Sequence, residues 1–357
     1  MSVIPRALCG YMFAGEGWWR DGEREGGREA GVFPARTTLN LSKPNPHHFP
    51  AASVPFHQGV FDGHSGSAAA RFLVDRLYPA LESALDEPAF AAEECDVAAT
   101  RSPAGVCCPV TLSPALAAAF DGVDRALLAS LARLRSGDPE RTSGSTATVL
   151  LARPGRLVAA NCGDSRAVLC RAGGAIDLTT EHRVYGPSPA AAAEIARVTG
   201  AGGWIDDGRV CGVLAVSRAF GDAGLKRPGL TTTLKQGVVD GWWDRAFADA
   251  HRAFTADPVI PTPDVTEIAT SPADEFVVIA SDGLWDVLSS RDAVSLARRA
   301  LRRGAGPAGA AEALAGAAAK RRTEDNVAVV VIDLQGEREE GGGGGGGGGF
   351  LSGLFGR

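Results

Sequence analysis

The sequence lacks the cysteine patterns of disulfide scaffolds and zinc ribbons. Its seven cysteines are scattered, odd in number, and include no CxxC pair. Such a set does not indicate a disulfide framework and favours a reducing compartment. No apolar run approaches the roughly 18–20 residues that span a bilayer, and the N-terminus lacks the continuous apolar region of a signal peptide. We therefore expect an intracellular protein of the cytoplasm or nucleus, without membrane insertion.

An excess of basic charge is also missing. The formal net charge of the 357 residues is -6, which gives no electrostatic footprint for nucleic acid, so we expect no nucleic-acid partner. The hydrophobic content of 45% and the charged content of 22% are those of an ordinary globular protein. The length suffices for one large domain or two smaller ones with a sizeable core.

From about residue 54 onwards the apolar residues follow regular patterns. Short apolar runs bounded by Gly, Pro and Asp predict strands, and apolar residues at helical spacing predict helices. The predicted strands include 146–152, 156–163, 165–173 and 326–334, and the predicted helices include 67–85 and 113–134. Strands and helices occur in groups rather than in strict alternation. This grouping favours an α+β fold of antiparallel sheets flanked by helices.

Four aspartates lie at the edges of these apolar runs: Asp62, Asp164, Asp282 and Asp325. A carboxylate followed by glycine at a strand end lets a cation approach both the side chain and the backbone carbonyl. Ligands that are all oxygen suit Mg²⁺ or Mn²⁺ rather than zinc. A single Asp-Gly more often marks a turn, but four aspartates at strand ends together favour a metal site.

Seven segments surround these aspartates and continue along the chain: GVFDGHSG (59–66), SGSTATVLL (143–151), NCGDSRAVL (161–169), LTTEHR (178–183), GVLAVSRAFGD (212–222), ASDGLWDVLS (280–289) and EDNVAVVVI (324–332). In these segments and their order, the sequence resembles the metal-dependent protein Ser/Thr phosphatases, the PPM or protein phosphatase 2C family. The resemblance spans about 36–334. It implies a central sandwich of two mostly antiparallel β-sheets flanked by helix pairs, with metals in a cleft at one end.

The resemblance also implies a ligand set for two Mg²⁺ or Mn²⁺ ions. Asp62 would bridge the ions and Gly63 would offer its carbonyl to one of them, while Asp282 and Asp325 would complete the ligands of the other. Asp164 matches a residue that, together with the one at Asp282, holds a weaker third ion in some members. Two ions in such a centre activate a water and stabilise both oxygens of an in-line displacement at phosphorus.

The same resemblance assigns catalysis to His64, as the general acid that protonates the departing Ser or Thr oxygen. The alternative for His64 is a turn histidine with a structural hydrogen bond. Hydrolysis would be direct, so no Cys or Ser nucleophile is needed. The implied substrates are phosphorylated proteins, and we expect the protein to be a monomer.

One departure from the family concerns the acidic residue that members carry upstream of the DGH segment. In the segment KPNPHHF (43–49), the register that fits the family's Lys-x-Asn-Gln-Asp pattern puts His47 where the acid should stand. In a second register, Arg36 matches the phosphate-binding arginine, but Asn40 and Leu41 replace the acidic pair. Neither register restores a carboxylate.

A third register takes the acid from GWWRDGERE, as Asp21, Glu23 or Glu25, and requires a long insertion after it. We consider it the weakest, because this fragment has no strand-like apolar residues beyond its two tryptophans. The open alternatives are a phosphatase with one weakened metal position that prefers Mn²⁺, a pseudophosphatase that binds phosphoproteins without turnover, and an aberrant N-terminal sequence.

The resemblance divides the chain into three parts. Residues 1–35 are expected to form an irregular segment, 36–334 the phosphatase domain, and 335–357 a flexible glycine-rich tail. Within the domain, about 226–257 is longer than the family usually has there. Its aromatic residues either cover the domain or form a docking surface.

Overall fold

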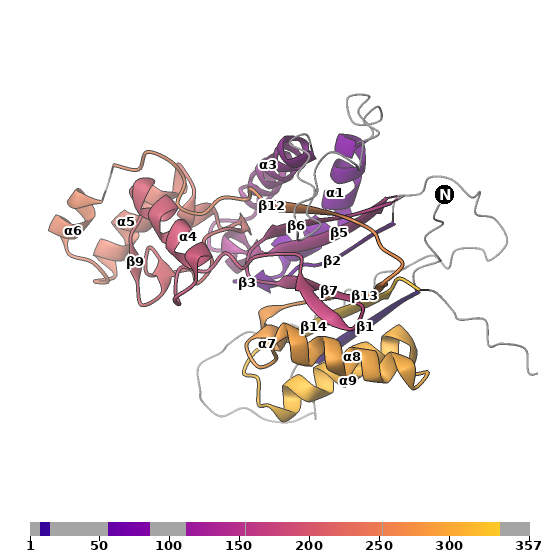
Figure 1. The fold of residues 1–357 in the computed structure, drawn as a ribbon. Helices are drawn as coiled ribbons and strands as arrows, with labels where there is room; N and C mark the ends of the chain where they lie inside the picture. The colour runs from indigo at the N-terminus through magenta and orange to yellow at the C-terminus, as the bar shows by residue number, and fades with distance from the viewer. Residues whose placement is uncertain (1–7, 15–55, 86–111, 154, 252, 336–357) are drawn as a thin grey trace, which may run out of the picture.

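Two antiparallel sheets pack face to face at the centre of the computed structural model, which describes residues 8–14, 56–85, 112–153, 155–251 and 253–335 (Figure 1). The five-stranded sheet has the order β1–β14–β13–β7–β8. Its strands are β1 (Leu8–Ala14), β14 (Val327–Asp333), β13 (Asp274–Ala280), β7 (Arg166–Arg171) and β8 (Gly174–Asp177). The four-stranded sheet has the order β12–β6–β5–β2. Its strands are β12 (Asp264–Ala269), β6 (Arg156–Cys162), β5 (Ala147–Arg153) and β2 (Phe56–Val60).

Helix pairs cover the outer faces of both sheets. Helices α1 (Ala68–Leu85) and α3 (Leu112–Leu131) lie on the four-stranded sheet, and α8 (Ser290–Arg302) and α9 (Gly306–Lys320) lie on the five-stranded sheet (Figure 1). The short helix α7 (Asp282–Trp285) follows β13. The fold class expected from the sequence, an α+β sandwich flanked by helix pairs, is confirmed.

Alternation along the strands builds three layers of core. In β13, Val277 and Ile279 point into the core between the sheets, whereas Phe276 and Val278 pack against α8 and α9. Both faces are apolar because successive side chains point to opposite sides of a sheet that is covered on both. This double burial explains why EFVVIA contains no polar alternation, and it places the polar residues of the strand ends outside the core.

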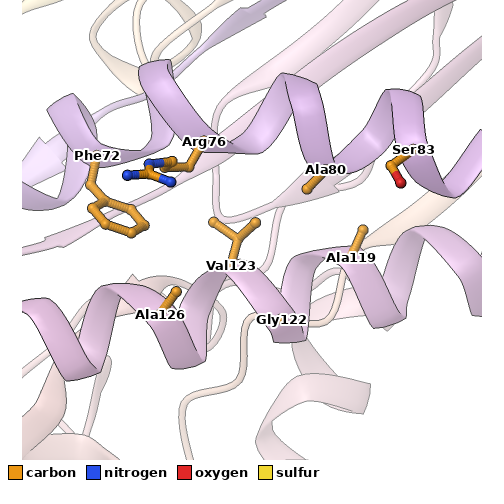
Figure 2. A pocket seen from close by; sticks show the side chains of 8 residues that line it. All are labelled: Phe72, Arg76, Ala80, Ser83, Ala119, Gly122, Val123 and Ala126. Atoms are coloured by element: carbon orange, nitrogen blue, oxygen red, sulfur yellow. The ribbon is translucent and has the colours of Figure 1, made fainter.

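The helix pair α1 and α3 meets along a seam that is deeply packed on one side only. Leu73, Leu77 and Leu81 of α1 are fully buried against the sheet. On the outer side, small residues leave a shallow groove between the helices (Figure 2). Its lining residues are Phe72, Arg76, Ala80, Ser83, Ala119, Gly122, Val123 and Ala126. None of these is a predicted site residue, so this groove is not the candidate active site.

Besides the two sheets and their helix pairs, the segment between β8 and β12 forms a further region of the fold, the covering region. It contains α4 (Pro189–Gly200), α5 (Gly229–Val239) and α6 (Arg245–Ala250), which lie at one end of the sandwich (Figure 1). Its short strands and 3₁₀ turn are β9 (Ile205–Asp206), β10 (Arg209–Val210), β11 (Phe220–Gly221) and η2 (Ala223–Leu225). A small three-stranded sheet of order β11–β4–β3 joins this region to the sandwich. Its other two strands are β4 (Gly144–Ser145), which follows the 3₁₀ turn η1 (Pro139–Thr142), and β3 (Gly63–His64).

The insertion expected at 226–257 forms α5 and α6, and most of its aromatic side chains pack inward. Trp243 and Phe247 contact Trp204 edge to face, with ring centroids 5.3 and 5.1 Å apart. Phe254 packs against the core of the same region. Trp242 is the exception, with 64% of its surface exposed. The covering role therefore holds for most of these aromatics.

Two elements differ from the sequence expectation. The expectation of irregular structure throughout 1–35 is wrong for Leu8–Ala14, which forms β1 and pairs with β14 over its full length. Its apolar residues are interrupted by Gly10 and do not alternate, so the run carries no period-two signal. Helix α9 was not predicted, because its Ala- and Gly-rich sequence shows little contrast between faces.

A buried ion network holds α4 on the sandwich. The carboxylate of Glu194 accepts hydrogen bonds from Ser217 Oγ at 2.6 Å, from Arg218 Nη2 at 2.7 Å and from Arg197 Nη2 at 3.0 Å. Burial opposes ionisation of Glu194, but Arg218, Ser217 and Arg197 outweigh it and lower its pKa to about 2. The network therefore requires the ionised carboxylate.

We expect Glu194→Gln to destabilise the fold by about 2 kcal/mol, because the partly buried guanidinium of Arg197 loses its charged partner and that of Arg218 keeps only Asp264. The lowered pKa also fixes a pH window. The stabilisation from Glu194 is fully present above its ordinary pKa of 4.5 and is lost as pH falls from there towards 2. Urea unfolding between pH 3 and pH 7 measures both effects. A variant whose unfolding free energy falls with acid as steeply as that of the wild type would contradict this assignment.

Candidate active site

The four aspartates predicted as metal ligands lie at strand ends in the structure. Asp62 lies between β2 and β3, and Asp164 lies in the turn between β6 and β7. Asp282 follows β13, and Asp325 lies two residues before β14. Because β13 and β14 are antiparallel neighbours with Ala280 opposite Val329, the end of one strand meets the start of the other.

Thr146 joins the Asp62 segment to the Asp164 turn. The backbone N–H of Asp62 donates to Thr146 Oγ1 at 3.2 Å, and the backbone N–H of Thr146 donates to the Asp62 carbonyl at 2.9 Å. Thr146 Oγ1 also lies 3.3 Å from Ser165 Oγ. At Gly163, where φ is +119°, a Cβ would come within 2.5 Å of Thr146. The glycine therefore allows the two segments to approach.

Gly283 likewise allows the segments that carry Asp282 and Asp325 to approach each other. A Cβ on Gly283 would lie 2.3 Å from the carbonyl oxygen of Asn326, so only glycine permits this contact. The backbone N–H of Ser281 donates to the Ala328 carbonyl at 3.0 Å. These contacts bring the Asp-Gly turn after β13 against the segment that carries Asp325.

The carboxyls that result form a cluster with excess negative charge. We call Asp62, Asp164, Asp282, Asp286 and Asp325 the acidic cluster. Burial, followed by the charges of Asp164 and Asp325, raises the pKa of Asp62 to about 7. Burial, followed by the charges of Asp164, Asp62 and Asp325, raises the pKa of Asp282 to about 8. Asp62, Asp282 and Asp325 therefore interact in every pair, which the proposed metal centre requires.

The cluster fits a divalent cation in charge and donor type. The buried Oδ1 of Asp282 has no protein donor, and the Asp62 carboxyl within hydrogen-bonding reach can satisfy it only by sharing a proton. A cation that replaces the proton would remove this repulsion. Within the part of the chain that the structure describes, however, no three Asp, Glu, His or Cys side chains already enclose a common point. The ligand cage is therefore not preformed there.

His64 adjoins the cluster and pairs with an acid that we did not predict. Its Nε2 lies 2.9 Å from both Oδ1 and Oδ2 of Asp222. Burial opposes the charged imidazolium, but Asp222 outweighs burial and raises the pKa of His64. At Gly144 between them, a Cβ would lie 2.2 Å from Nε2 and 2.3 Å from Asp222 Oδ2. The pair therefore requires glycine at position 144.

The remaining predictions are of two kinds. Gly63 lies in β3, directly beside Asp62 and His64, as the sequence indicated. Arg36 and His47, and the alternative acids Asp21, Glu23 and Glu25, lie outside the described residues, so their roles stay predictions. Asp222 is the residue of this candidate site that we did not predict, although it ends the quoted segment GVLAVSRAFGD. Its only sequence signal is an acid after glycine, and its partner His64 is 158 positions away.

Comparison with known proteins shows the family to which this site belongs. The family profile described as protein phosphatase 2C matches residues 39–327. The chain belongs to the protein phosphatase 2C family. It is 42% identical to Protein phosphatase 2C 57 of Arabidopsis thaliana over 69% of this chain and 59% of that protein. It is 34% identical to Probable protein phosphatase 2C 13 of the same plant, over 70% of this chain and 54% of the relative.

The fold agrees with this assignment. A solved serine-threonine phosphatase 2C from Toxoplasma gondii aligns with a TM-score of 0.57 at 22% identity, over 80% of this chain and 87% of that one. The chain spans less than three-fifths of the length of the two plant relatives. In the described residues, no helix is long and apolar enough to cross a membrane.

Without a bound metal, the neighbouring carboxylates repel the charge of Asp282, and this repulsion destabilises the fold. We expect Asp282→Asn to raise the melting temperature in EDTA by a few degrees, equivalent to about 1–2 kcal/mol, because it removes a buried carboxylate that repels its neighbours. The same variant should lose the stabilisation that Mn²⁺ gives the wild type. Thermal unfolding in EDTA and in millimolar Mn²⁺ measures both. A variant that is less stable in EDTA, yet stabilised as much as the wild type by Mn²⁺, would contradict this reading.

Proposed function

We propose that this chain is a protein serine/threonine phosphatase that depends on Mg²⁺ or Mn²⁺. The observation that carries the proposal is the acidic cluster beside the His64–Asp222 pair. Asp62, Asp282 and Asp325, with the carbonyl of Gly63, would hold two ions, and Asp164 with Asp282 would hold a third where one binds. The chemistry supplied by such a centre is an activated water and stabilisation of the charge that develops on the phosphoryl oxygens.

The protein's own residues divide the remaining work. His64 holds a proton for the departing Ser or Thr oxygen, and Asp222 keeps the imidazole oriented and protonated. Neither the buried Cys162 nor Cys170 is suited to act as a nucleophile, because burial raises the pKa of both thiols. Hydrolysis without a covalent intermediate agrees with this arrangement.

A pseudophosphatase that binds phosphoproteins without turnover is the second candidate. It is favoured by the absence of a carboxylate in the two best registers of the N-terminal segment. It also agrees with the lack of a preformed three-ligand cage among the described residues. Both candidates recognise phosphorylated proteins, so turnover is what distinguishes them.

The first test is hydrolysis of a phosphothreonine peptide across titrations of Mn²⁺ and Mg²⁺, with Asp282→Asn as the control. We expect metal-dependent phosphate release with a preference for Mn²⁺, reduced at least 100-fold in the control variant. A folded wild type that releases no phosphate with either metal is a pseudophosphatase. Equal turnover by the wild type and Asp282→Asn would show that the active site lies elsewhere.

The role of His64 predicts a dependence on the leaving group. Loss of a general acid typically costs 10²–10⁴-fold, so we expect His64→Gln to slow hydrolysis of phosphothreonine peptides by that order. Hydrolysis of p-nitrophenyl phosphate should suffer far less, because nitrophenolate leaves without a proton. Equal losses on both substrates would assign His64 a structural or ligand-positioning role.

Asp222 gives a matching prediction for pH. Asp222 raises the pKa of His64, so the acid form persists to higher pH in the wild type. Asp222→Asn should shift the alkaline limb of the kcat–pH profile to lower pH, with KM little changed. An unshifted limb with a uniformly lower rate would mean that Asp222 acts on the fold and not on the proton of His64.

A further inference from the structure

Arg183 lies inside the acidic cluster and bonds to three of its members. Its Nε donates to Asp164 Oδ2 at 3.2 Å, its Nη2 to Asp282 Oδ2 at 3.4 Å and its Nη1 to Asp286 Oδ1 at 2.8 Å. Each guanidinium nitrogen therefore serves a different carboxylate. The planar fork of arginine suits such an arrangement, whereas the single ammonium group of lysine does not.

The surroundings hold this guanidinium in place. The Arg183 side chain is 13% exposed, and its charged group lies 5.3 Å from the ring centroid of Tyr185. The Arg183 backbone forms an isolated antiparallel bridge with Val216. One residue earlier, the N–H of Ser217 donates to the carbonyl of His182 at 2.9 Å. The position of the side chain is thus a consequence of the fold and not of a free surface rotamer.

Two of the bonded acids, Asp164 and Asp282, are the pair expected to hold a third divalent ion. The guanidinium uses Oδ2 of each. A divalent cation on the same oxygens would stand within a few ångströms of a fixed positive charge, and such like charges repel strongly in a partly buried site. One cationic group must give way before the other can bind to these oxygens.

We propose that Arg183 is a built-in counter-cation that occupies the place of a third divalent ion and lowers the affinity of Asp164 and Asp282 for metal. Metal would then bind to Asp62 and Asp325, and Arg183 would pair with Asp164 and Asp286. Asp282 would contact both the metal and the arginine. This inference rests on the proposed metal centre. It adds that one position of that centre is regulated by competition between metal and arginine.

A single arginine does not neutralise the cluster. Arg183 bonds to three of the five carboxyls, and Asp62 still interacts with the charges of Asp282 and Asp325. The competition is therefore confined to the oxygens that Arg183 bonds. Tighter positions elsewhere in the cluster should bind metal in the wild type and in Arg183 variants alike.

The test is direct Mn²⁺ binding to the full chain, measured by equilibrium dialysis and calorimetry without substrate. We expect Arg183→Gln and Arg183→Met to bind the weakest class of Mn²⁺ at least 10-fold more tightly than the wild type. Arg183→Lys keeps the charge but cannot bond to all three carboxylates, so its Mn²⁺ affinity should lie between those of the wild type and Arg183→Gln.

Arg166→Gln is the matched control. Arg166 is also a shielded arginine near this end of the sandwich, but it pairs with Glu181 at 3.5 Å and lies over the Trp285 ring. The Arg166→Gln substitution removes the same charge but leaves Arg183 bonded to the acidic cluster. It should therefore change Mn²⁺ affinity far less than Arg183→Gln. An equal gain in both variants would reduce the effect to general electrostatics and overturn the proposal.

The remaining outcomes are also decisive. If the wild type binds no Mn²⁺ at all, the proposed metal centre fails. If it binds Mn²⁺ but the uncharged Arg183 variants bind no more tightly, the centre stands and the counter-cation fails. Should those variants unfold in EDTA, folding restored by Mn²⁺ would support replacement of arginine by metal. Failure to fold at saturating Mn²⁺ would instead make Arg183 a purely structural residue.

Discussion

Repulsion among carboxylates at one end of the sandwich is the constraint to which the surrounding structure responds. The two sheets place several strand ends together, and their aspartates range from the buried Asp164, through the half-buried Asp62 and Asp282, to the exposed Asp325. Burial makes their charges costly to bring together, as the raised pKa values of Asp62 and Asp282 record. A fold that maintains such a site must compensate with protons, with arginine or with metal. The stability of the sandwich core is what allows it to carry this unfavourable charge.

Glycine is the second requirement of the site, because the backbones that carry these acids approach each other closely. At Gly144, Gly163 and Gly283 an added Cβ would come within 2.5 Å of a neighbouring atom. Each of these positions joins segments that are distant in the sequence. Close packing of strand ends thus explains the glycine of the Asp282-Gly283 motif, whereas a Cβ at Gly63 would come no closer than 3.1 Å to a neighbouring atom, that of Ala70. This packing also positions His64 against Asp222, which no local motif could do.

The sequence predicted those parts of the protein whose signal is local. The apolar run at 326–334 predicted the strand that the structure has as β14, and the structure brings Asp282 and Asp325, at the ends of neighbouring strands, into the acidic cluster. Contacts over long separations could not be predicted in this way. Asp222 meets His64 across 158 positions, and Arg183 reaches acids on two separate segments, Asp164 in the β6–β7 turn and Asp282 and Asp286 at the two ends of α7. These pairings depend on the order of strands in the sheets, which hydrophobic periodicity does not encode.

Arg183 can act as a counter-cation because its backbone is anchored independently of its side chain. The backbone bridge to Val216, the bond from Ser217 to the His182 carbonyl and the bond from His182 N–H to the Gly163 carbonyl do not involve the guanidinium. Loss of its ion pairs would therefore free the side chain without detaching the segment that leads to α4. That helix has its own anchor in Glu194, Arg197 and Arg218. The exchange of arginine for metal can accordingly remain a local event at the end of the sandwich, while the covering region stays folded.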